Sequence, residues 1–220
     1  MNTGHRKRLK NRFLEEGLDS FEPHEILELL LFFSIPRRDT NKIAHNLLKE
    51  FGSLSGVLET EVKELVKVGG IGENSAFLIS LIPHLSRRYL NDRWGDKPEL
   101  NSSSKAGDYA TSLFAGRTYE VFYVICLDAQ NRVNYAALAH EGTIKEAPIY
   151  PRVIVEICLR HKANSVILAH NHPGGSLNPS RGDIEATKVI KNALESISIK
   201  VVDHIIVCGE KYVSFAERGL

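Results

Sequence analysis

The sequence predicts a protein of two unlike parts, an all-helical amino-terminal unit followed by a mixed α/β unit. Up to about residue 89, apolar residues recur every three or four positions, which is the spacing of helices. After about residue 106, short runs rich in β-branched and aromatic residues alternate with helical patterns. We therefore expect a helical domain at residues 1–90, a linker at 91–106 and an α/β domain at 107–220.

The first part contains four stretches with helical spacing and no run with the two-residue period of a strand. Gly52 and Gly69 directly follow two of these stretches and are typical helix stops. The four stretches are residues 25–33, 43–51, 62–68 and 76–85. This part is therefore expected to be built from helices.

The stretch at residues 91–106 loses its periodicity and is rich in polar, turn-forming residues, as linkers are. Beyond it, four strand candidates are separated by helix candidates at residues 152–160 and 184–194. The strand candidates are residues 121–127, 133–138, 166–169 and 201–207. Strands that alternate with helices predict a mixed sheet with helices packed on it.

The composition is that of an ordinary globular protein, with 43% apolar and 25% charged residues, and it excludes a disordered or fibrous chain. Lys and Arg number 28 against 27 Asp and Glu, so the chain lacks the basic excess of a general nucleic-acid binder. Three cysteines are too few for a disulfide framework. Without a secretory signal or a long apolar segment, we expect a cytoplasmic protein with no membrane partner.

A glycine turn stands between two predicted helices of the first part and reads Gly69-Gly70-Ile71-Gly72. Its spacing resembles a helix-hairpin-helix motif, in which the isoleucine fills the core and the amides of Gly70 and Gly72 face a DNA phosphate. Unpaired amides at a helix start attract anions, and Lys67 is a nearby cation. The alternative is a plain helical hairpin whose glycines permit tight packing.

The strongest chemical signal lies where the strand candidate at 166–169 runs into His170 and His172. Positions i and i+2 of an extended chain point to the same side, so both imidazoles can converge on one point. A loop rich in Pro and Gly then leads to a helix whose first turn holds Asp183. Two imidazoles and one carboxylate suit Zn²⁺ and leave a fourth position for water, as in catalytic zinc sites.

Structural interpretations of the same residues compete with this one. Ser180 and Asp183 have the spacing of a helix capping box, and the histidines alone are compatible with polar residues at a strand end. The histidine pair and the Ser180–Asp183 pair together, at the end of a predicted strand, favour a metal site.

The order His170-x-His172, seven residues, Ser180, two residues, Asp183 resembles the signature of the JAMM/MPN+ metalloproteases, and its surroundings resemble the bacterial RadC branch. This resemblance implies a JAMM/MPN-like, cytidine-deaminase-like mixed sheet flanked by helices, preceded by a helix-hairpin-helix domain. It further implies that His170, His172 and Asp183 bind zinc. Ser180 would then help to hold the metal-bound water or the oxyanion of a tetrahedral intermediate.

One part of the resembled site is missing from its expected place. The family is expected to carry a general-base glutamate a few residues before its Gly-Thr pair, whereas this chain has Ala136 and Ala137 in that stretch. Glu141 and Glu146 are the nearby substitutes, and Glu141 is equally compatible with a solvated turn residue. Loss of a general base typically costs about 10²–10⁴-fold in rate.

Two functions therefore stay open. The first is a zinc-dependent metallohydrolase of the JAMM type, acting on a protein or peptide substrate at an amide or isopeptide bond. The second is a weakly catalytic or non-catalytic factor of DNA repair or recombination, which binds the DNA backbone through the helical domain and has a structural or vestigial zinc site. A weaker third, a nucleobase deaminase, lacks the expected Pro-Cys-x-x-Cys and His-x-Glu residues.

Overall fold

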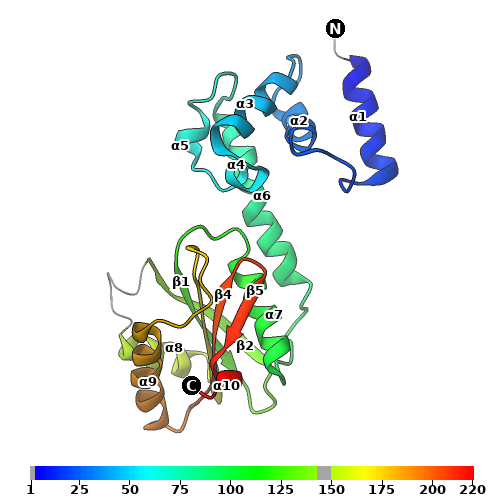
Figure 1. Ribbon diagram of the computed structural model, residues 1–220. Helices are drawn as coiled ribbons and strands as arrows, with labels where there is room; N and C mark the ends of the chain where they lie inside the picture. Colours follow the sequence, from blue (N-terminus) through cyan, green and yellow to red (C-terminus); the bar gives the residue numbers. More distant parts are fainter. Residues whose placement is uncertain (1–2, 143–149) are drawn as a thin grey trace. The chain divides into compact units, whose positions relative to one another are not determined.

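The computed structural model describes residues 3–142 and 150–220, and the chain divides into two compact units, Met1–Leu85 and Ser86–Leu220 (Figure 1). The division falls inside α6 (Glu73–Asp92). Residues 91–106, expected to be a linker, begin in the last turn of α6 and end inside α7 (Ser103–Phe114). The serine-rich composition marks a helix start, because Ser102 Oγ accepts a hydrogen bond from the Lys105 amide at 3.2 Å.

The elements of the first unit that the structure describes are helices. Their apolar faces meet in one core, which includes Leu27, Leu31, Leu47 and Ile79. None of the described helices in either unit combines the length and the apolar character needed to cross a membrane. The helices before α6 are α1 (Thr3–Glu16), α2 (Pro23–Ser34), α3 (Asn41–Phe51), α4 (Leu54–Leu58) and α5 (Val62–Leu65).

Two cations of the basic amino end attach α1 to its neighbours. The Arg6 guanidinium donates to the carbonyl oxygens of Ile35 and Arg38, both at 2.6 Å. Arg12 donates to the Glu25 carboxylate at 2.5 Å, and this hydrogen bond holds the pKa of Glu25 below its ordinary value. These two side chains are therefore engaged within the unit.

The glycine turn lies between α5 and α6, and Ile71 is buried in the helical core at 6% exposure, as its spacing predicts. Gly70 has a φ of +97°, and a Cβ there would lie 2.8 Å from Ile43 Cδ1. A Cβ on Gly72 would meet nothing within 4 Å. Tight packing therefore explains Gly70 but gives no reason for glycine at position 72.

The second unit is built on a five-stranded sheet with the order β2-β1-β3-β4-β5, which confirms the predicted mixed α/β class. β1 runs antiparallel to both β2 and β3, β3 is parallel to β4, and β4 is antiparallel to β5. The strands are β1 (Val121–Leu127), β2 (Val133–Glu141), β3 (Ser165–Asn171), β4 (Lys200–Cys208) and β5 (Lys211–Ser214).

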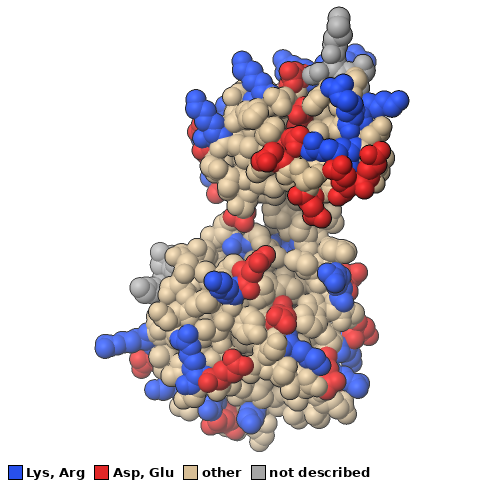
Figure 2. Space-filling view, turned by 45° about the vertical axis from the view of Figure 1, so that its right-hand side comes forward, with Lys and Arg blue, Asp and Glu red and all other residues tan. Residues whose placement is uncertain are grey.

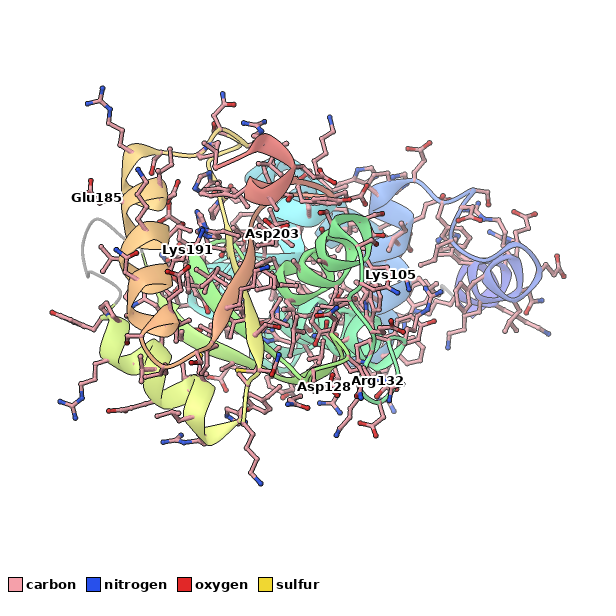
Figure 3. The ribbon with its side chains drawn as sticks, turned by 90° about the horizontal axis from the view of Figure 1, so that it is seen from below. Lys105, Asp128, Arg132, Glu185, Lys191 and Asp203 are labelled. Atoms are coloured by element: carbon pink, nitrogen blue, oxygen red, sulfur yellow. The ribbon has the colours of Figure 1, made fainter. Side chains whose placement is uncertain are left out.

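Helices cover both faces of this sheet. α8 (Pro151–Arg160) and α9 (Arg181–Glu195) pack on one face, and α7 packs on the other (Figure 3). Side chains alternate between the two cores along β1 and β3, so Phe122 of β1 faces α8 and α9 while Tyr123 faces α7. The short helix α10 (Phe215–Arg218) follows β5.

Replacement of the two turn glycines is expected to separate packing from any other role. Gly70→Ala should lower the free energy of unfolding by roughly 2 kcal/mol or more, because the left-handed backbone and the contact with Ile43 both resist a Cβ. Gly72→Ala should change it by less than about 1 kcal/mol. Urea denaturation of the full chain, followed by circular dichroism, measures both, and equal losses would contradict the packing role of Gly70.

Candidate metal centre

The two histidines lie at the carboxyl end of β3, the central strand of the sheet. His170 lies within the strand, is 1% exposed and points to the same face as Leu168, the face that α8 and α9 cover. His172 follows the strand, and its amide donates to the carbonyl of Val207 in β4 at 2.8 Å. This bond continues the strand pairing past the end of β3, so the backbone at His172 stays extended and its side chain points the same way as that of His170.

Asp183 stands in the first turn of α9 and belongs to a complete capping box. Its amide donates to Ser180 Oγ at 3.1 Å, and its Oδ2 accepts a hydrogen bond from the Ser180 amide at 2.7 Å. The same carboxylate faces the histidines, with Oδ1 3.3 Å from His170 Nε2 and Oδ2 3.6 Å from His172 Nε2. The cap and the candidate ligand are therefore one arrangement, not alternatives.

The ligand atoms of His170, His172 and Asp183 all lie within 4.8 Å of one another. The two Nε2 atoms are 2.9 Å apart, and His172 Nδ1 lies 2.7 Å from the carbonyl oxygen of Ser176. A carbonyl oxygen only accepts, so Nδ1 of His172 carries a proton, and in the neutral ring Nε2 then has the lone pair that a metal needs. Two imidazole nitrogens and a carboxylate fit a divalent cation such as Zn²⁺.

Charge and burial set the protonation of this cluster. Hydrogen bonding to Asp183, the Ser176 carbonyl and the negative charges of Asp183 and Glu120 raise the pKa of His172 above its ordinary value, against the effect of burial. Burial acts to raise the pKa of Asp183, but its hydrogen bonds with His170 and His172 outweigh burial and hold that pKa well below its ordinary value. Asp183 is therefore an ionised carboxylate although it is only 3% exposed.

Glu120 is a candidate functional residue that the sequence interpretation missed. β1 and β3 are antiparallel with Phe122 opposite His170, and Glu120 directly precedes β1 at this end of the strand pair. The charge of Glu120 acts on the titration of His172, as this placement requires. The signal was available in principle, since Glu120 is the residue before the first strand, but reading it needs the strand pairing.

The substitutes expected for the general base lie elsewhere or outside the described residues. The Glu141 side chain is half exposed and accepts hydrogen bonds from Arg117 and Tyr119, each at 3.2 Å. Ala136 and Ala137 belong to β2, which β1 separates from β3. Glu146 falls within residues 143–149, outside the part of the chain that the structure describes.

Asp203 and His204 sit side by side in β4 but serve different neighbours. The Asp203 carboxylate accepts hydrogen bonds from the His204 amide, Ser214 Oγ and the Ala216 amide at 2.7, 2.6 and 2.9 Å, and so ties β4 to β5 and α10 (Figure 3). His204 instead contacts His170, with 2.8 Å between His204 Nε2 and His170 Nδ1. Asp203 is thus a structural residue, and His204 lies directly behind a candidate ligand.

Comparison with protein families shows which known families the sequence matches. Residues 100–220, which include all three candidate ligands, match the family described as RadC-like JAB domain. The chain belongs to the RadC-like JAB domain family. Residues 2–77 of this RadC-like protein match the family described as UPF0758 N-terminal.

A curated relative extends this likeness to the whole chain. The UPF0758 protein FN0909 of Fusobacterium nucleatum subsp. nucleatum is 37% identical over 226 residues, which cover 100% of this chain and 97% of that protein. JAB domains typically bind a metal, and the buried His170, His172 and Asp183 of this RadC-like domain form a group that can hold one.

Proposed function

We propose that this RadC-like protein is a zinc-dependent metallohydrolase that cleaves an amide bond in a peptide or isopeptide substrate. The observation that carries the proposal is the convergence of His170, His172 and Asp183, whose ligand atoms lie within 4.8 Å of one another. A bound zinc ion would supply Lewis acidity and would lower the pKa of a water ligand to about 7.

The surrounding residues supply what hydrolysis needs besides the ion. Glu120, whose negative charge acts on the pKa of His172, would take a proton from the attacking water on a carboxylate oxygen and return it to the leaving amine. The Ser180 hydroxyl oxygen accepts the Asp183 amide, which leaves its own proton available to donate toward an oxyanion. His170, His172 and Asp183 hold the ion and keep the site at the carboxyl end of β3.

We further propose that the helical unit binds the phosphate backbone of DNA. Gly70 and Gly72 line a hollow of about 650 Å³ together with Arg37, Arg38 and Glu73, at the amino end of α6. Arginine side chains and the free amides of a helix start both favour phosphate. Figure 2 shows positive and negative side chains interspersed on the visible face of each unit, so any such contact is local.

Lys67, the cation expected to assist the turn, has another partner. Its Nζ lies 2.6 Å from Oε2 of Glu64, in an exposed ion pair. Lys67 is not among the residues that line the hollow, so in this proposal Arg37 and Arg38 are the cations that contact the phosphate.

Metal analysis of the purified full chain tests the zinc site. The wild-type protein should carry about one zinc ion per chain, and His172→Ala should lose most of it because one of three protein ligands is removed. His161→Ala is the matched control, since His161 stacks on Tyr135 outside the cluster. Equal zinc in the wild type and in His172→Ala would exclude the site.

Two isosteric substitutions compare the candidate general bases. With fluorescently labelled casein and fluorogenic peptide amides as probes, Glu120→Gln should lower hydrolysis by roughly 10²–10⁴-fold while zinc content is retained. Glu141→Gln should leave the rate near that of the wild type, because Glu141 pairs with Arg117. A normal rate in Glu120→Gln, or an equal loss in both variants, would refute the role of Glu120.

Binding of a short DNA duplex across a salt series tests the helical unit. The affinity of the wild-type chain should fall with salt, and Arg37→Ala/Arg38→Ala should weaken binding and reduce the salt slope by about 2. Lys42→Ala/Lys49→Ala removes two exposed cations from α3 of the same unit and serves as the control. Equal effects of the two double variants would argue against a phosphate site in the hollow.

A further inference from the structure

A chain of hydrogen-bonded groups, from the buried His204 to the half-buried Thr187, lies behind His170. His170 Nδ1 is 2.8 Å from His204 Nε2, and His204 Nδ1 is 2.6 Å from Thr187 Oγ1. Thr187 Oγ1 in turn lies 2.6 Å from the backbone carbonyl oxygen of Asp183. The chain therefore starts at the ring of one candidate ligand and ends at the backbone of another, and β3, β4 and α9 each contribute to it.

The backbone carbonyl of Asp183, at the end of this hydrogen-bond chain, determines which atoms in the chain donate and which accept. A carbonyl oxygen can only accept, so the hydroxyl of Thr187 must donate to Asp183. The hydroxyl oxygen is then the acceptor for His204, which must carry its proton on Nδ1. The bare Nε2 of His204 can only accept, so His170 carries a proton on Nδ1, and its neutral ring then has the lone pair on Nε2.

His172 reaches the same protonation of Nδ1 through a single hydrogen bond. His172 donates from Nδ1 to the Ser176 carbonyl, and its Nε2 is bare as well. Two bare Nε2 atoms 2.9 Å apart, beside the Asp183 carboxylate, form an arrangement that a cation stabilises. His204 itself is not available as a further ligand in this arrangement, because its Nε2 already accepts from His170.

Aromatic side chains pack against the imidazole rings of His170 and His204. His204 is 1% exposed and lies between the ring of Phe122, 5.7 Å away between centroids, and the ring of Phe215, 4.6 Å away. Phe122 also stacks on His170 at 6.1 Å. These rings pack against both imidazoles, and the hydrogen bonds of His204 carry the direction set by Thr187 to His170.

We propose that Thr187 and His204 are positioning residues of the metal centre, a relay that selects the tautomer of His170 in which Nε2 faces the ion. This inference rests on the proposed zinc site. Thr187 touches neither the ion position nor a substrate, and it acts through His204. The hydroxyl at position 187, not the bulk of the side chain, is the group that matters.

The test compares zinc affinity, measured by competition with a chromophoric chelator, in full-length variants. Thr187→Val removes the hydroxyl at nearly constant volume and should weaken zinc binding roughly 10–100-fold, the usual cost of losing a partner behind a ligand. Thr187→Ser keeps the hydroxyl and should restore near wild-type affinity. Thr111→Val is the matched control, since Thr111 Oγ1 makes the same helical bond to Gly107 at 2.9 Å, far from the relay in sequence.

A second readout does not depend on metal affinity. Imidazole ¹⁵N spectra of the wild-type chain should show His170 and His204 with the proton on Nδ1, and Thr187→Val should mix the tautomers of His204. A wild-type chain that binds no zinc would overturn the metal site itself. Zinc binding by the wild type with unchanged affinity in Thr187→Val, or a His204 proton found on Nε2, would overturn the relay alone.

Discussion

The candidate site depends on the carboxylate of Asp183. Its Oδ2 accepts the Ser180 amide and so closes the first turn of α9, while both oxygens face the histidines of β3. Its backbone carbonyl accepts the Thr187 hydroxyl, which begins the relay to His170. Helix geometry, ligand geometry and tautomer therefore share one residue, and a change there would disturb all three.

The sequence revealed those parts of the site that are local in the chain. His170 and His172 are separated by one residue on a strand, and Ser180 and Asp183 by one helical turn, so periodicity alone brings each pair together. The other parts depend on pairing between strands. Glu120 reaches its place through the antiparallel register of β1 with β3, and His204 through the parallel pairing of β4 with β3, neither of which a single sequence specifies.

The helix α7 was missed in the sequence because of its composition. Strands β1, β3 and β4 contain runs of β-branched or aromatic residues, whereas α7 buries several small residues, among them Ala106, Gly107 and Ala110. A Cβ on Gly107 would lie 2.2 Å from the ring of Tyr212 in β5, so this face of α7 has to be small. The buried Ala106, Tyr109, Ala110 and Leu113 do have helical spacing, but the polar composition of residues 91–106 led us to extend the linker into this helix.

The loop between β3 and α9 has His172 at its entrance and Asp183 just past its exit, and it contains Gly175 with a φ of +93°. An ion held by both residues would act as a cross-link that closes this loop, as a disulfide would in an oxidised protein. The entropy lost when the loop becomes ordered would then lower the affinity for the metal ion. A bound ion would therefore oppose opening of this segment and the exposure of its backbone to proteases.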